Sequence, residues 1–204
     1  MTVSRRLLLA TPALLLAHTA FADDPAATAP IQALVQGILA GMKVGKSTPF
    51  QQRFHTLAPL VDRAFDLPGV LAASVGPRLA SLPTDQQAVL QDVFRKFTIA
   101  SYVANFDTFD GERIEVVPQQ RMIGADIVVG TKIIPTRGDT VPIDYVMRRS
   151  SQGWRAVDVL LNGTISQNAV KRSDFRSLVN ATSAQPLIDS LRRKVAELSG
   201  GTVS

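Results

Sequence analysis

The feature of this chain that most restricts its fold is a change in the spacing of apolar residues near residue 110. Between residues 30 and 109 the apolar side chains recur every three or four positions, which is the period of an amphipathic helix. Beyond Asp110-Gly111 they alternate with polar side chains, which is the period of a half-buried strand. Two more helical segments follow these strands. Helices, then strands, then helices again predict an α+β fold.

The helical half divides at turn-forming residues. We expect a first helix with Pro30 in its first turn, and a second helix that breaks or kinks at Pro59. Residues 65–82 contain several Pro and Gly residues and therefore predict short helical pieces. A long helix follows, and its start matches a capping box formed by Thr84 and Gln87.

The second half predicts a small sheet and two closing helices. Short, turn-rich gaps separate the strands, and such gaps favour hairpins and therefore an antiparallel meander. We expect four strands, at residues 113–117, 121–134, 141–149 and 153–161, and helices at residues 173–180 and 186–198.

The first 22 residues have the layout of a secretory signal peptide. Arg5 and Arg6 form a positive region, and residues 7–17 form an apolar stretch too short to span a bilayer. The small residues of Ala20-Phe21-Ala22 match a cleavage site, so we expect export with cleavage after Ala22, by the Sec or the twin-arginine route. A flexible lead over residues 23–29 and one domain over residues 30–204 would remain.

Composition argues against several classes of function. The chain has no cysteine, two histidines and a net charge of +5, which falls to +3 without Arg5 and Arg6 (20 basic against 17 acidic residues). No basic run is interleaved with aromatic residues, so we expect no nucleic-acid partner. No nucleophile elbow, P-loop or dinucleotide motif appears, and no ligand spacing for a metal. We therefore expect no metal, no cofactor and no catalytic residue.

Three stretches resemble the periplasmic MlaC family, whose members are also called toluene-tolerance proteins. They are LPTDQQAVLQDVFRKFTIASYVANFDTFDGERIEVVP from Leu82, GWRAVDVLLNGTISQNAVKRSDFRSLV from Gly153, and FRSLVNATSAQPLIDSLRRKVAEL from Phe175. The stretch FDTFDGERIEV is also similar to the branch associated with hopanoid biosynthesis. The positions that match the family's motifs in the second stretch are Asp158, Val159, Gly163, Ser166, Arg172, Ser173 and Phe175.

The resemblance implies a fold and a function. The helices and a curved four-stranded antiparallel sheet would enclose an apolar cavity that holds acyl tails while the headgroup faces water. The protein would be a periplasmic carrier of phospholipid, or of a hopanoid. Its partners would be an inner-membrane ABC transporter with an MCE-type protein and an outer-membrane lipoprotein complex.

Apolar residues of both halves provide a candidate lining for such a cavity. Burying an acyl chain of about fifteen methylenes is worth roughly 12 kcal/mol, so a carrier needs an apolar wall more than polar contacts. The candidate lipid-binding residues are Val61, Phe65, Leu71, Val75, Phe94, Phe97, Tyr102, Ile127, Val129, Ile143, Tyr145, Met147, Trp154, Val157 and Val159. Basic residues of the expected rim, which would meet a headgroup or an acidic partner, are Arg148, Arg149, Lys171, Arg172 and Arg176.

Two other interpretations stay open. The apolar residues could fill an ordinary core, as in an envelope module that binds through its surface. A cone-shaped α+β fold also suits small-molecule enzymes, for which the available groups are Asp126, Asp144, Asp158, Tyr102 and Tyr145. We expect a structural role for the isolated His55, and a hydrogen-bonded or Arg-paired structural role for Asp158, because a buried carboxylate needs a partner. Which face of the last strand points inward depends on its register.

Overall fold

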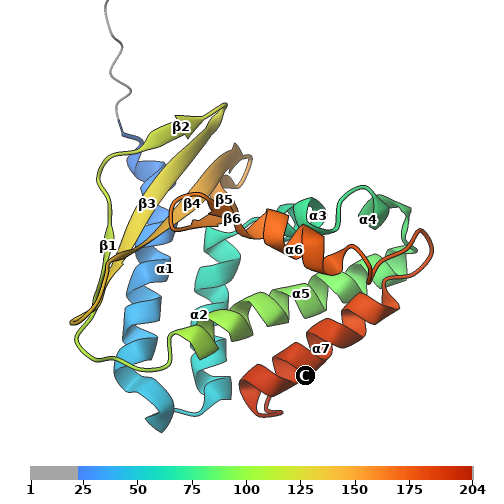
Figure 1. Cartoon of the computed structure of the whole chain (residues 1–204), viewed down its shortest axis with the longest axis horizontal. Helices are drawn as coiled ribbons and strands as arrows, with labels where there is room; N and C mark the ends of the chain where they lie inside the picture. Colours follow the sequence, from blue (N-terminus) through green and yellow to red (C-terminus); the bar gives the residue numbers. More distant parts are fainter. Residues whose placement is uncertain (1–22, 204) are drawn as a thin grey trace, which may run out of the picture.

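The computed structural model describes residues 23–203, so the expected signal peptide lies outside the described residues. Figure 1 shows helices at both ends of the chain and a sheet between them. The elements are α1 (Pro25–Val44), the short 3-10 turn η1 (Gly45–Ser47), α2 (Phe50–Ala64), α3 (Leu67–Val75), α4 (Arg78–Ser81), α5 (Thr84–Asn105), β1 (Arg113–Val116), β2 (Arg121–Ile123), β3 (Asp126–Ile134), β4 (Val141–Ser150), β5 (Gly153–Leu161), β6 (Ile165–Ser166), α6 (Gln167–Phe175) and α7 (Gln185–Ser199). The α+β class predicted from the sequence is confirmed.

The sheet has six strands where we expected four. All pairings are antiparallel, in the order β1-β3-β4-β5-β6, with β2 also paired to β3. The strand expected over residues 121–134 is two strands, because Gly124 takes a positive φ of 61° that allows a tight turn after β2. The short β6 pairs with the end of β5.

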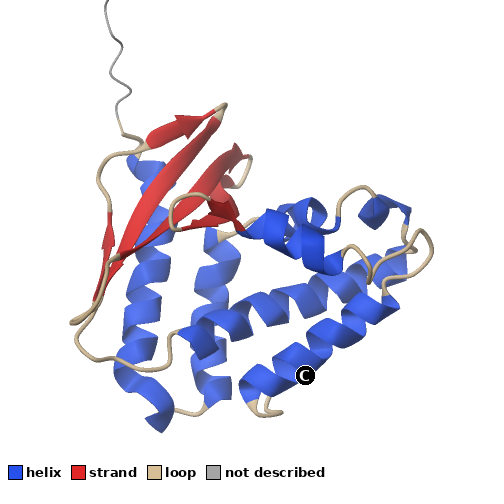
Figure 2. Ribbon diagram, in the orientation of Figure 1, coloured by secondary structure: helices blue, strands red, loops and turns tan. Residues whose placement is uncertain are grey.

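The helices cover one face of the sheet and extend away from it. Helices α1 and α2 lie beneath the strands, whereas α5 and α7 pack side by side in the part of the molecule that projects from the sheet (Figures 1 and 2). The face of the sheet toward the helices contributes Val129, Tyr145, Met147 and Ala156 to the main core. This inner face is therefore the wall that any ligand between the two layers would contact.

A β-bulge in β5 decides which of its side chains belong to that wall. Met147 pairs with Ala156 but Val146 pairs with Asp158, so Val157 is an extra residue without a partner on β4. As a result Ala156 and Val159 both belong to the inner face. Val157 belongs to a separate cluster on the outer face together with Val128, Val146 and Leu160. Our assignment of Val157 to the lipid-binding wall is therefore wrong.

Helix α1 begins earlier than expected. The Asp24 carboxylate accepts a hydrogen bond from the backbone N–H of Ala26 at 2.9 Å, which caps the helix at its start. The indole Nε1 of Trp154 donates to the same carboxylate at 3.0 Å. Residues 25–29 are thus helical and not part of a flexible lead, and Pro30 lies inside α1 and not in its first turn.

Helix α5 begins at Thr84 as expected, but three other details of the helices differ from the sequence-based expectation. Helix α2 continues through Pro59 without a break. At the start of α5 the Thr84 side chain makes no capping bond, and the Gln87 amide instead donates to the carbonyl of Leu82 at 2.8 Å. Helix α6 (Gln167–Phe175) starts before the expected range of 173–180 and overlaps only its beginning, because the Ser166 hydroxyl accepts from the N–H of Ala169 and caps the helix there.

Candidate functional site

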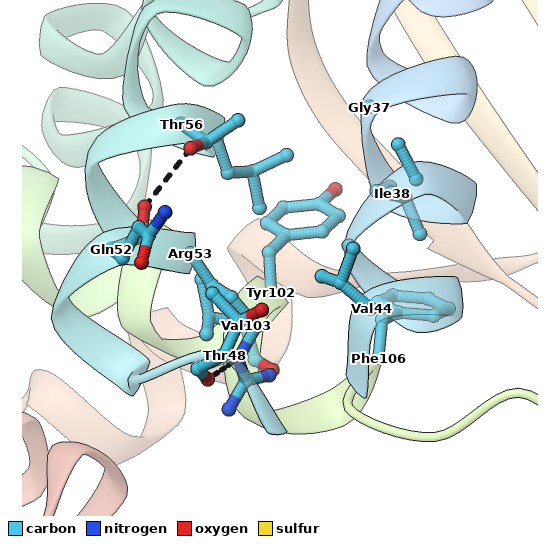
Figure 3. Close-up of a pocket in the computed structure, with 13 residues that line it drawn as sticks. Gly37, Ile38, Val44, Thr48, Gln52, Arg53, Thr56, Tyr102, Val103 and Phe106 are labelled. Carbon is cyan, nitrogen blue, oxygen red and sulfur yellow. Dashed lines mark hydrogen bonds between the residues drawn. The ribbon is translucent and has the colours of Figure 1, made fainter. Parts of the chain in front are cut away.

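A cavity of about 200 Å³ lies among α1, α2 and α5 (Figure 3). Helix α1 gives it room at Gly41, which presents no side chain to it, whereas a side chain at Gly37 would collide with Leu60 of α2. At Gly41 an added Cβ would meet no other atom within 4 Å. Ile38 and Leu57 supply apolar walls, while Thr48, Gln52 and Thr56 place polar groups around it.

Arg53 is the charged side chain among the described residues that line this cavity. Only 9% of it is exposed, and it lies on the buried side of α2 with Phe54 and Leu57. Its Nε donates to the carbonyl of Thr48 at 3.1 Å and its Nη1 to the carbonyl of Val103 at 3.2 Å. No ion pair joins Arg53 to a carboxylate in the part of the chain that the structure describes. Among the described residues this cation is therefore met by carbonyl oxygens and the Phe50 ring and by no carboxylate.

The sequence analysis did not select Arg53, although a signal was present. Position 53 follows Phe50 by three residues and precedes Leu57 by four, so it falls on the apolar stripe of the second helix. A charge in such a stripe needs a partner once the helix packs.

Tyr102 forms the inner wall of the cavity. Its ring stacks on that of Phe106, with centroids 6.1 Å apart, and packs at 5.9 Å from Phe65. Burial raises the pKa of Tyr102 and that of Tyr145, which lies on the inner face of the sheet. Tyr102 therefore separates the cavity from the interior between the helices and the sheet.

The predicted lining residues meet in that interior. Fourteen of the fifteen, all except Val157, belong to one apolar cluster between the sheet and the helices. They contact one another closely there: Val61, Leu71, Val129 and Met147 are each 0% exposed. Of the fifteen, Tyr102 alone lines the 200 Å³ cavity.

The predicted basic rim does not form one surface. Arg172 and Arg176, together with Arg78, line a cleft of about 690 Å³ between α3–α4 and α6. Arg172 donates to the carbonyl of Ala73 at 2.9 and 2.6 Å, and Arg78 donates to that of Val179 at 2.8 Å. These bonds satisfy carbonyls near the ends of α3 and α6 and hold the two segments together. No acidic residue is among the described residues that line the cleft.

The remaining rim candidates lie elsewhere. Arg148 makes a bidentate ion pair with Asp126, at 2.9 and 2.6 Å, and Arg149 follows it as an exposed residue of β4. Lys171 is partly buried on α6, and this burial lowers its pKa. Arg148 is therefore already neutralised and does not contribute an unpaired charge to the Arg78–Arg172–Arg176 cleft.

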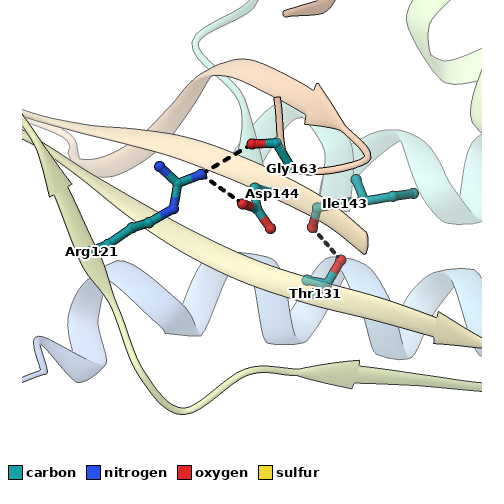
Figure 4. A network of polar contacts seen from close by, with 5 residues as sticks. All are labelled: Arg121, Thr131, Ile143, Asp144 and Gly163. Carbon is teal, nitrogen blue, oxygen red and sulfur yellow. Dashed lines mark hydrogen bonds and ion pairs between the residues drawn. The ribbon is translucent and has the colours of Figure 1, made fainter. Parts of the chain in front are cut away.

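The carboxylates considered for an enzyme have structural partners. Asp144 accepts from Arg121 at 2.8 Å, and Arg121 also donates to the carbonyl of Gly163, which ties β2, β4 and the turn after β5 together (Figure 4). Asp158 accepts from the N–H groups of Val159 and Asn168 and from the Ser166 hydroxyl, which confirms the structural hydrogen bonding expected for it. Within residues 23–203 no cluster of three His, Cys, Asp or Glu side chains could hold a metal ion. No described helix is long and apolar enough to cross a membrane.

Comparisons with known proteins place the chain in a recognised group. A family profile described as MlaC protein matches residues 32–193. The phospholipid-binding protein from Ralstonia solanacearum, solved in complex with a phospholipid, has a similar structure with a TM-score of 0.69. The two sequences are 20% identical, and the match covers 85% of this chain and 98% of that one. No curated protein sequence matches the chain. At this identity the structural likeness establishes the fold.

Proposed function

The chain belongs to the MlaC family, and we propose that it is a carrier that binds a phospholipid and moves it across the periplasm. The observation that carries this proposal is the continuous apolar cluster between the helices and the inner face of the sheet. It occurs in a fold shared with a protein that was solved with a phospholipid bound. A hopanoid, which is also largely hydrocarbon, is the alternative ligand.

The acyl tails would lie where the fourteen predicted residues now contact one another. A cavity of about 200 Å³ is smaller than the roughly 300–1,000 Å³ of pockets that hold drug-sized ligands. The helices must therefore move away from the sheet to admit a tail. Contacts between side chains would be replaced by contacts with methylenes, each worth about 0.8 kcal/mol when buried. The exchange keeps apolar surface away from water, which is why a packed interior is compatible with a carrier.

Delivery would depend on a different part of the surface. The cleft lined by Arg78, Arg172 and Arg176 lies between α3–α4 and α6, away from the cavity among α1, α2 and α5. We therefore propose that these arginines meet an acidic surface of a partner and not the headgroup. The partners would be an inner-membrane ABC transporter with an MCE-type protein and an outer-membrane lipoprotein complex. A signal peptide over residues 1–22 would bring a single lipid-binding domain to them.

Extraction tests the proposal directly. The protein is purified from cell envelopes without detergent, extracted with organic solvent, and the extract is analysed by mass spectrometry. We expect about one phospholipid or hopanoid per protein molecule. An extract without lipid, together with no uptake from phospholipid vesicles, would contradict the proposal and favour an interaction module with a filled core.

A further inference from the structure

We propose that Arg53 binds the phosphate of the lipid headgroup, and that the cavity among α1, α2 and α5 is therefore the entrance for the acyl tails. This inference rests on the proposed function. It assigns headgroup binding to Arg53, which was not among the basic residues expected at the rim.

The first argument is the energetic position of Arg53. A buried cation without a counter-charge is costly, because neutral carbonyls replace only part of the hydration that it loses. Arg53 is 9% exposed and bonds the carbonyls of Thr48 and Val103. A phosphate would supply the missing negative charge, and a guanidinium binds phosphate with two parallel hydrogen bonds.

The second argument is the donors that Arg53 keeps available. A guanidinium has five N–H donors, and Nε and Nη1 each use one for a carbonyl. Nη2 makes no hydrogen bond to any described residue. Every fully buried side-chain nitrogen or oxygen among those residues has a hydrogen-bond partner, so Nη2 is not one of the fully buried atoms. Nη2 is therefore accessible. The two carbonyl bonds and the Phe50 ring, whose centroid is 5.6 Å from the guanidinium carbon, fix the orientation of the group.

The third argument is the match between the cavity and an amphipathic ligand. Thr48 and Gln52 lie with Arg53 on one side of the cavity, while Ile38 lies across it beside Tyr102 (Figure 3). A phosphate at Arg53 would leave the attached chains pointing along the apolar wall. Beyond Tyr102 the chains would reach the cluster between the helices and the sheet.

Nearby charges favour an anion at this end of the molecule. The carboxylate of Asp107 is already paired with Lys46 at 3.1 Å. Lys43, on the last turn of α1, lies over the Phe109 ring at 5.6 Å and adds positive charge. The bonds from Arg53 also cover a carbonyl at the end of α5, which would otherwise repel a phosphate.

The test compares two lipids with identical, fluorescently labelled acyl chains: phosphatidylglycerol and diacylglycerol, each delivered from a cyclodextrin complex. We expect the wild-type protein to bind phosphatidylglycerol roughly ten- to a hundred-fold more tightly, the range of a charge-assisted hydrogen-bonded contact. Arg53→Gln should lose this preference through weaker phosphatidylglycerol binding alone, and Arg53→Lys should keep part of it. Arg193→Gln removes a charge from the exposed face of α7 and should bind both lipids like the wild type.

Each other outcome overturns the assignment. Equal loss of both lipids in Arg53→Gln would mean that Arg53 only supports the helix ends, and an unchanged preference would mean that the phosphate binds elsewhere. Inorganic phosphate should compete with phosphatidylglycerol and not with diacylglycerol; phosphate binding without any effect on the lipid would identify a site for free phosphate. If Arg53→Gln does not fold, equal wild-type affinities for the two lipids still refute the inference. Binding of neither lipid would refute the proposed function as well.

Discussion

Replacing Gly41 by leucine should make the protein more stable and a poorer lipid binder at the same time. Gly41 lies inside α1, and a side chain there would enter the cavity without meeting another atom at its Cβ. Glycine inside a helix costs about 0.8–1 kcal/mol relative to alanine, and leucine recovers most of that difference. Partial burial of the leucine adds on the order of 1 kcal/mol.

The expected gain is therefore about 2 kcal/mol, or a rise in melting temperature of roughly 4–8 °C for a chain of this size. Four added carbon atoms in a cavity of about 200 Å³ should block the route to Tyr102 and lower lipid occupancy at least several-fold. Gly41→Ala is the matched control. It gains the helix propensity, about 1 kcal/mol, but adds one methyl group and should keep most of the bound lipid.

Thermal unfolding and lipid extraction of the same preparations measure both effects. Unchanged lipid occupancy in a stabilised Gly41→Leu protein would show that tails do not pass through this cavity. A loss of stability would show instead that the space beside Gly41 is not available, which would refute the geometric argument.

Three further predictions concern stability. The raised pKa values of Tyr102 and Tyr145 contribute stability that is complete below about pH 10, the pKa of unfolded tyrosine, and is lost as the pH rises through the folded-state values. The free energy of unfolding, measured in urea, should therefore decline between about pH 9 and pH 11. The double variant Tyr102→Phe, Tyr145→Phe should lack this decline, and an equal decline in both proteins would contradict the prediction. Asp24→Ala should lower the free energy of unfolding by about 1–3 kcal/mol, because the cap of α1 and the bond from Trp154 are both lost. The fluorescence emission of this single tryptophan should also shift to the red. An unshifted spectrum would argue against the bond between Trp154 and Asp24. Asp158→Ala should lower the free energy of unfolding by roughly 2–4 kcal/mol, because three donors lose their acceptor. A free energy of unfolding in urea that stays unchanged would mean that water replaces the carboxylate.

Periodicity alone was sufficient to predict the class of fold and several elements. The change of period at Asp110-Gly111 separates α5 from β1, and the strand expected over residues 153–161 matches β5 at both ends. These predictions succeed because a half-buried strand or helix must repeat its apolar residues with its own geometry. The same reasoning missed the break at Gly124, since a single glycine in an apolar run can be accommodated in a strand or can form a turn.

The candidate site was harder to predict because it depends on tertiary pairing. Because of the bulge at Val157, the side chains that follow it in β5 point to the opposite face of the sheet from the one that strict alternation would predict. The bulge is visible only in the pairing of β5 with β4. The other fourteen candidate lining residues belong to one apolar cluster, but apolar residues look the same in a filled core and in a lipid cavity. Arg53 was missed because a helical stripe was judged by its apolar members and not by its one charged exception.

Photo-crosslinking with a phospholipid that carries a diazirine at the end of one acyl tail tests the central claim most directly. The claim is that tails lie against the inner face of the sheet, so the label should attach to Val129, Tyr145 or Met147, as peptide mass spectrometry would show. The neighbouring outer-face residues Val128 and Val146 alternate with them along the same strands. Labelling of those outer-face residues, or bound lipid that labels neither face, would contradict the account.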